Sequence, residues 1–110
     1  MKTSTIATVV TLLATPVFAQ SSKGHDDPGV RIFQEHCIAC HGPDGRAQTE
    51  TGAKVGAADL TTDAVQRQSD SQLSKIVQNG KGKMPAFQGK LTDDEMRAVI
   101  AYLRQLASKK

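Results

Sequence analysis

The feature that most constrains this fold is a pair of cysteines with a histidine directly after the second. Residues 36–42 read HCIACHG, so Cys37, Cys40 and His41 fall within a single short segment. Thiols and imidazoles at such spacing are the side chains that proteins use to hold metals and cofactors. We therefore expect the fold to form around whatever these three residues hold.

Three chemistries are compatible with the spacing. A redox-active Cys37–Cys40 pair is expected beside a strand–helix–strand unit, and no segment here alternates as a strand would. A structural zinc ion needs four ligands, so it would have to recruit His25 or His36, at a spacing typical of no zinc finger. In the third, both thiols add to the vinyl groups of a haem, and His41 becomes the proximal ligand of its iron. The motif favours the haem.

The first residues have the order of a secretory signal peptide. Lys2 precedes the apolar run IATVVTLLAT, and Pro16 and the segment VFA follow it, which predicts cleavage after Ala19. The apolar run is shorter than the roughly twenty residues that a bilayer-spanning helix needs. We expect residues 1–19 to be removed, 20–27 to form a flexible leader and 28–110 to form one domain in the periplasm. Export supports the haem interpretation, because haem c is attached outside the cytoplasm.

Charge and composition argue against nucleic acid as a partner. The whole chain has 14 basic and 11 acidic residues, and loss of Lys2 with the signal peptide leaves 13 and 11, a net charge of +2. A nucleic-acid-binding domain is expected to have a strongly basic face with stacking aromatic residues, whereas the remaining aromatic side chains are Phe33, Phe87 and Tyr102. A domain of this size with so few large apolar residues has little core of its own. A bound haem would supply the missing core.

The rest of the chain predicts an all-α fold of three to four helices with long loops. Asp27 is a candidate N-cap with Pro28 at the first helical position, so a first helix leads into the cysteine motif. The segment 42–68 is rich in glycine and is expected to be a loop with one short helix near 61–66. Capping boxes and apolar spacing predict two further helices; their key residues are Ser69, Gln72 and the terminating Gly80, and then Leu91, Thr92, Glu95, Met96, Val99, Ile100, Leu103 and Leu106.

The order of three segments resembles the class I monohaem cytochromes c, especially the small bacterial electron carriers of the c553 or c5 kind. These segments are CIACHG, NGKGKMPAF and LTDDEMRAVIAYLRQL. The resemblance implies the cytochrome c fold around one covalently attached haem c with its iron, and it implies that Gly29 and Phe33 meet Val99 and Tyr102 where the first and last helices cross. The family often has a proline whose carbonyl group binds the proximal histidine, and this chain has Ala58 at that place.

A second axial iron ligand is sought among the methionines. Met84 stands in a glycine-rich loop before Pro85, which keeps its backbone out of the helical region. Met96 is explained as an apolar residue of the last helix, and Met1 leaves with the signal peptide. Met84 as a simple core residue remains an alternative, and His25 and His36 are expected to be surface or second-layer side chains. The apolar residues expected against the haem are Ile38, Leu60, Leu73, Ile76 and Phe87.

Ligation by His41 and Met84 would occupy all coordination positions of the iron, so that no substrate could bind and the iron could only change its charge. We therefore expect a monomeric one-electron carrier, not an enzyme, with a redox protein as donor and another as acceptor. Four lysines flank Met84 and suggest a basic rim that docks on an acidic surface: Lys75, Lys81, Lys83 and Lys90. The rival functions are an electron-entry subunit of an oxidase or dehydrogenase complex, and a haem protein that binds small ligands.

Overall fold

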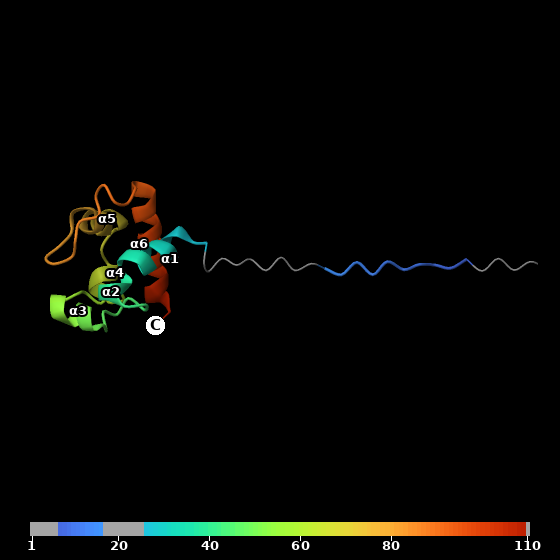
Figure 1. Cartoon of the computed structure of the whole chain (residues 1–110), viewed down its shortest axis with the longest axis horizontal. Helices are drawn as coiled ribbons and strands as arrows, with labels where there is room; N and C mark the ends of the chain where they lie inside the picture. Colours follow the sequence, from blue (N-terminus) through green and yellow to red (C-terminus); the bar gives the residue numbers. More distant parts are fainter. Residues whose placement is uncertain (1–6, 17–25, 110) are drawn as a thin grey trace, which may run out of the picture.

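The computed structural model describes residues 7–16 and 26–109 of the chain, and its order of elements is all helical (Figure 1). The helices are α1 (Pro28–His36), α2 (Ile38–His41), α3 (Glu50–Val55), α4 (Asp63–Gln66), α5 (Asp70–Asn79) and α6 (Asp93–Ser108). Within the described ranges the extended pairings are limited to two isolated bridges, Lys81 with Met84 and Gln88 with Leu91. The predicted all-α class is confirmed.

Helix α1 begins where the sequence predicts and carries the cysteine motif at its end. A carboxylate oxygen of Asp27 accepts a hydrogen bond from the backbone N–H of Gly29 at 2.8 Å, and Pro28 occupies the first turn. The helix ends at His36, and Cys37 is its C-cap residue. Because α2 starts at Ile38, the chain bends at Cys37 without leaving the helical region.

Both predicted capping boxes are present. At the start of α5 the Ser69 hydroxyl accepts from the Gln72 N–H at 3.1 Å, while the Gln72 side chain accepts from the Ser69 N–H at 2.9 Å. Thr92 and Glu95 repeat this arrangement at the start of α6, at 3.1 and 2.8 Å. Reciprocal bonds of this kind satisfy backbone donors that a helix N-terminus leaves unpaired, so both helices start at fixed residues.

The segment 42–68 contains more helix than the sequence predicts. The short helix α4 lies where one is expected, but α3 is an additional helix in a stretch expected to be loop. Thr49 caps α3 by accepting from the Gly52 N–H at 2.8 Å, and Gly56 ends it in the left-handed conformation. A single capped turn without an apolar stripe gives no periodic signal, which is why the sequence analysis missed α3.

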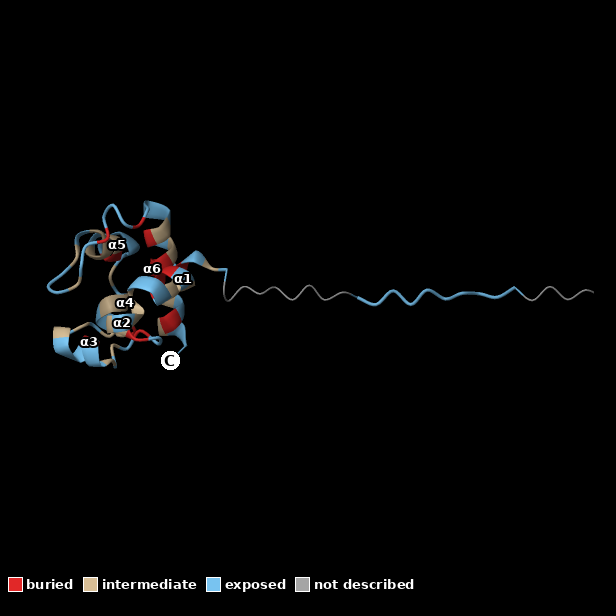
Figure 2. Ribbon diagram, viewed as in Figure 1, coloured by how far each residue is buried: buried red, intermediate tan, exposed pale blue. Residues whose placement is uncertain are grey.

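The core forms where α1 crosses α6 (Figure 1), and α6 carries five of the ten buried apolar residues; Figure 2 colours the buried residues red. The rings of Phe33 and Tyr102 meet edge to face with their centroids 5.3 Å apart. Gly29 packs on the backbone of Ala98, the neighbour of the expected Val99. The buried cluster consists of Ile32, Phe33, Leu73, Phe87, Leu91, Met96, Val99, Ile100, Leu103 and Leu106.

The amino-terminal segment stays outside this core. Residues 7–16 form neither helix nor strand and expose four large apolar side chains, Val9, Val10, Leu12 and Leu13. The predicted cleavage site after Ala19, most of the 20–27 leader and His25 lie outside the described residues. Across 7–16 and 26–109, every helix is too short or too polar to traverse a bilayer.

Candidate haem site

The two thiols and the imidazole of the motif share one helical turn. The carbonyl oxygen of Cys37 accepts hydrogen bonds from the N–H groups of Cys40 at 3.3 Å and His41 at 2.9 Å. Both cysteines are half-buried free thiols. The turn therefore presents two neighbouring sulfur atoms and one ring, as attachment and ligation of a single group would require.

The electrostatics of the Cys37 thiol argue against a redox-active pair. Burial, with a smaller contribution from Cys40, raises the pKa of the Cys37 thiol to about 11. Catalytic thiols of disulfide exchange have pKa values held below the ordinary range, because the thiolate is the nucleophile. Among residues 7–16 and 26–109 no three histidine, cysteine or acidic side chains are arranged to hold a metal ion, and His25, which a zinc site could recruit, lies outside these ranges.

His41 is oriented by the backbone of a distant loop. Its Nδ1 lies 2.9 Å from the carbonyl oxygen of Ala58, seventeen residues further along the chain. A carbonyl oxygen can only accept, so Nδ1 carries the proton and Nε2 keeps its lone pair. This arrangement fixes the tautomer of a metal-binding histidine and raises its basicity. Alanine thus provides the carbonyl group for which the family often uses proline.

Thr49, which the sequence analysis missed, binds the backbone of the cysteine motif. The hydroxyl of Thr49 lies 3.0 Å from the carbonyl oxygen of Ala39 and 2.9 Å from that of Cys40, and it also caps α3. Thr49 therefore ties the end of α2 to the start of α3. A threonine before Glu50 is an N-cap signal, but nothing in the sequence indicates that it also reaches the cysteine motif.

Met84 lies in a loop that backbone hydrogen bonds attach to α5. The N–H of Met84 donates to Lys81 at 2.9 Å, and the N–H of Phe87 donates to the carbonyl oxygen of Val77 at 3.0 Å. Gly80 starts this loop with a φ of +75°, and a Cβ there would lie 2.6 Å from the carbonyl oxygen of Met84. The loop is therefore closely folded, and it holds Met84 half-buried against the core.

The other candidate ligands have different surroundings. Met96 is a buried residue of α6 with 5% of its surface exposed, as its interpretation as a core residue predicts. The ring of His36 meets the ring of Phe87 edge to face at 5.6 Å, and its Nε2 lies 3.8 Å from a carboxylate oxygen of Glu35. His36 thus has local partners on α1 and on the loop that follows Met84.

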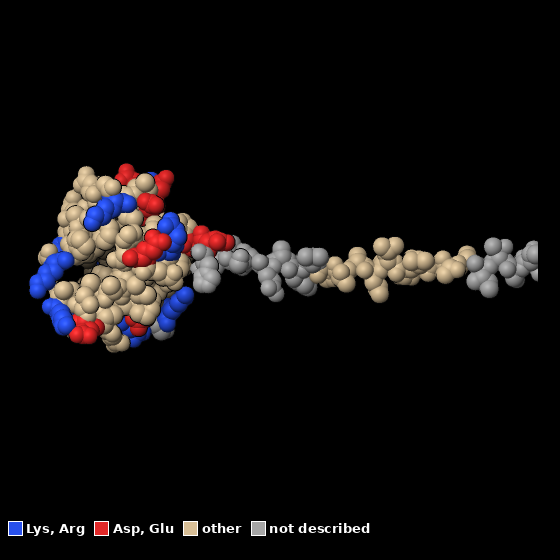
Figure 3. Space-filling model, in the orientation of Figure 1, with Lys and Arg blue, Asp and Glu red and all other residues tan. Residues whose placement is uncertain are grey.

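Several apolar residues lie against the core without being fully buried. They come from widely separated segments: Cys37, Ile38, Leu60, Val65, Val77, Met84 and Tyr102. Figure 3 shows a hollow between the part of the molecule that contains α5 and the part that contains α2, α3 and α4. Two thiols, a histidine with a free Nε2 and a half-buried thioether are groups that suit a covalently attached haem.

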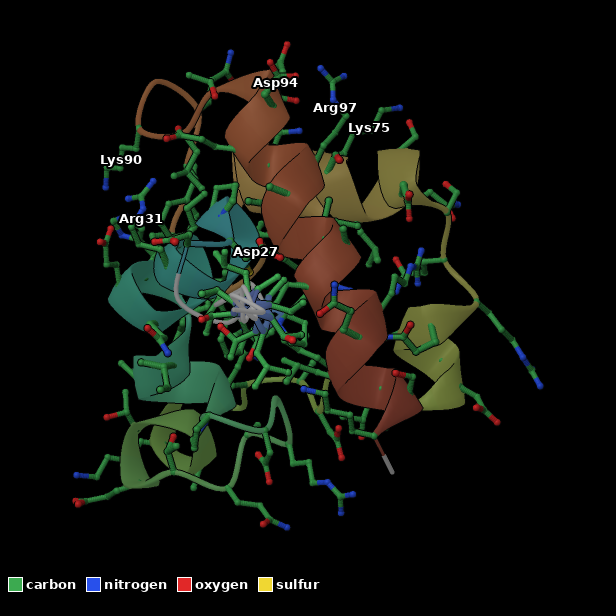
Figure 4. The ribbon with its side chains drawn as sticks, turned by 90° about the vertical axis from the view of Figure 1, so that its right-hand side faces the viewer. Asp27, Arg31, Lys75, Lys90, Asp94 and Arg97 are labelled. Carbon is green, nitrogen blue, oxygen red and sulfur yellow. The ribbon has the colours of Figure 1, made fainter. Side chains whose placement is uncertain are left out.

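The lysines around Met84 do not form one cluster. Lys81, Lys83 and Lys90 are exposed on the loop that follows α5, and Lys90 Nζ lies 5.9 Å from the centroid of the Phe87 ring. Figure 4 shows Lys75 and Lys90 on opposite sides of α6. Lys75 is therefore separate from Lys90, whereas Lys81, Lys83 and Lys90 belong to the loop between α5 and α6.

Comparison with known proteins agrees with this geometry. A family model described as cytochrome c oxidase, cbb3-type, subunit III matches residues 24–103. The chain is 36% identical to cytochrome c6 of Leptolyngbya boryana over 84 residues, which cover 74% of this chain and 92% of that protein. It is 32% identical to the cbb3-type oxidase subunit FixP of Bradyrhizobium sp. (strain ORS 278). That match covers the whole of this chain and only 38% of FixP.

A solved structure of a c-type cytochrome is also similar to this chain. The KustC0563 c-type cytochrome superposes with a TM-score of 0.66 at 30% identity, covering 71% of this chain and 95% of that one. The matched family model covers residues 24–103, and cytochrome c6 of Leptolyngbya boryana, at 36% identity, shares 92% of its length with this chain. The chain belongs to the class I monohaem cytochromes c, proteins of electron transport that carry a covalently attached haem c with its iron.

Proposed function

We propose that this chain is a periplasmic one-electron carrier in which Cys37 and Cys40 attach the haem and His41 and Met84 ligate its iron. The observation that carries the proposal is the contact of His41 Nδ1 with the Ala58 carbonyl oxygen at 2.9 Å. It leaves Nε2 as the only ring nitrogen that can bind a metal, directly beside two free thiols.

Met84 is the proposed second ligand because of its loop. Its half-buried side chain lies on a segment that α5 holds by backbone hydrogen bonds, whereas Met96 is enclosed within the core. Haem c supplies an iron that changes its oxidation state by one electron. A thioether on one side and an imidazole on the other would exclude water and substrates from the iron, and the thioether would favour the ferrous state.

The surroundings of the two ligands support transfer over catalysis. His41 is fixed by backbone contacts and Met84 by a tightly folded loop, so little rearrangement would accompany a change of charge. The exposed Lys81, Lys83 and Lys90 lie on the Met84 loop, and we propose that they orient an acidic redox partner. In this proposal residues 1–19 direct export, residues 28–110 form the domain, and the protein works as a monomer.

Fractionation tests this proposal. A periplasmic extract is separated by gel filtration, and each fraction is stained for haem and titrated for redox-active iron. The proposal predicts that the chain elutes as a free monomer that exchanges one electron reversibly. A high-spin ferrous protein, or one that exchanges no electron with any physiological donor or acceptor, would show that the carrier proposal is wrong.

A second candidate is an electron-entry subunit of an oxidase complex. It is favoured by the matched family model and by FixP, both of which carry the description of a cbb3-type oxidase subunit. Gel filtration of detergent-solubilised membranes from the same cells, run beside the periplasmic extract, decides between the two. Co-elution of all the haem-stained chain with a large membrane complex, even after a salt wash, would favour the subunit.

A further inference from the structure

Arg104 of α6 binds the segment that joins α4 to α5. One terminal nitrogen donates to the backbone and side-chain oxygens of Gln66 at 2.9 and 3.2 Å. The other donates to the carbonyl oxygen of Gln68 at 2.7 Å and to a carboxylate oxygen of Asp70 at 2.8 Å, which also accepts from Nε at 3.2 Å. Backbone carbonyl groups take two of these bonds, so Arg104 fixes the course of the chain as well as pairing its charge.

Gln66 connects Arg104 to the loop whose carbonyl group binds His41. Its side-chain Nε2 donates to the carbonyl oxygen of Leu60 at 2.7 Å. The N–H of Leu60 in turn donates to the carbonyl oxygen of Gly45, also at 2.7 Å, which ties the loop to the segment after the motif. Leu60 is two residues beyond Ala58, whose carbonyl oxygen binds His41 Nδ1.

Ala58 needs such support because its own backbone is not restricted. A proline at this position would fix φ by its ring, whereas alanine leaves both backbone angles free. Ala58 is also exposed, so packing does not confine it. The hydrogen bonds at Leu60 hold this stretch together with those of the two neighbours of Ala58: the Ala57 N–H donates to the Gly52 carbonyl oxygen at 2.9 Å, and Asp59 accepts from Thr61 and Thr62.

We propose that Arg104 is a positioning residue that, through Gln66 and Leu60, holds the Ala58 carbonyl oxygen against His41 Nδ1 and so tunes the reduction potential. The inference rests on the proposed role of His41 as an axial ligand. A firm hydrogen bond makes the imidazole more basic and favours ferric iron, so loosening it should raise the potential.

Loss of the Arg104 charge should shift the reduction potential in the opposite direction, so the sign of the shift separates the two roles. Removing a positive charge near the haem stabilises the ferric state and lowers the potential. A purely electrostatic role therefore predicts a lower potential in Arg104→Gln, and the positioning role predicts a higher one. Gln66→Ala breaks the same connection without changing any charge, and it remains informative if Arg104→Gln folds poorly.

The measurements are made on the holoprotein. Redox titration gives the potential, and proton NMR of the ferrous form gives the exchange rate of the His41 Nδ1–H. Arg104→Gln and Gln66→Ala should both raise the potential and speed this exchange at least about tenfold. Arg104→Lys, which keeps the charge and one donor to Gln66, should recover part of both effects.

Two control variants separate positioning from general weakening. Asp70→Asn changes only the exposed partner of Arg104, and Arg97→Gln removes a charge from the same helix where Arg97 pairs with Asp94. Neither should speed the exchange. Equal exchange rates in Gln66→Ala and the wild type, or a lower potential in Arg104→Gln, would overturn the inference. If the wild type shows no axial histidine resonance, the proposed function fails instead.

Discussion

Gly29 in α1 lies directly against the backbone of Ala98 in α6. A Cβ on Gly29 would lie 2.8 Å from the carbonyl carbon of Ala98 and closer still to its oxygen. Real Cβ atoms do not approach backbone atoms so closely, so only glycine permits this crossing. The crossing brings Phe33 onto Tyr102 and fixes the helix that leads to the cysteine motif.

Gly29→Ala should therefore destabilise the folded holoprotein by about 1–3 kcal/mol, because the two helices must move apart. Denaturant unfolding followed by circular dichroism measures this change. Gln34→Ala, an exposed substitution in the same helix, should alter the free energy of unfolding by less than about 0.5 kcal/mol. Equal stabilities for the two variants would show that α6 can shift freely at this point.

Local signals made much of this fold predictable. The capping residues Asp27, Ser69 and Thr92 act within a few residues, so the starts of α1, α5 and α6 follow from the sequence. The motif itself is local, and Cys37, Cys40 and His41 occupy one turn as its spacing predicts. The family resemblance predicted in addition that the first and last helices cross at Gly29. There Gly29 contacts Ala98, the neighbour of the expected Val99.

Long-range contacts could not be predicted in this way. Arg104 binds residues 34 to 38 positions earlier, and Thr49 reaches back to the carbonyl groups of α2. A single polar residue on an amphipathic helix does not reveal its partner, because its choice depends on how the helices pack. The separation of Lys75 from Lys90, which lie to either side of α6 in Figure 4, likewise follows from packing.

The haem should supply much of the stability of this small domain. Replacing both Cys37 and Cys40 by alanine would remove the two proposed covalent attachments, and it would leave a core of only ten buried apolar residues. The variant should be a largely unfolded chain without haem. Far-UV circular dichroism during thermal melting measures this, and a cooperative helical transition in the haem-free variant would show that the polypeptide core suffices alone.

The lysines on the Met84 loop should steer a partner. Lys81, Lys83 and Lys90 are exposed, and exposed charges are screened beyond about 8 Å at physiological ionic strength. Electron transfer to the natural acceptor should slow as salt rises and should slow further in Lys81→Glu with Lys83→Glu. Lys75→Glu is the matched control, because Lys75 lies on α5 and apart from Lys90 in Figure 4. Rates that respond to Lys75 as strongly as to the loop lysines would contradict a docking role for this rim.

Met96 should matter for stability and not for the iron. Its side chain is 5% exposed in the core between α6 and its neighbours. Met96→Ala should lower the free energy of unfolding by about 2–5 kcal/mol, as expected for a large-to-small change in a core. The visible absorption spectrum should stay that of a low-spin, six-coordinate haem. A high-spin spectrum in this variant would assign the ligand to the wrong methionine.

The central claim is that His41 and Met84 together close the iron to outside ligands, and carbon monoxide binding tests it most directly. The ferrous wild type should not bind carbon monoxide at neutral pH, whereas ferrous Met84→Ala should bind it and have a lower reduction potential, because the thioether is lost and water enters. Met96→Ala serves as the control and should not bind it. Binding by the wild type, or an unchanged spectrum in Met84→Ala, would contradict the account.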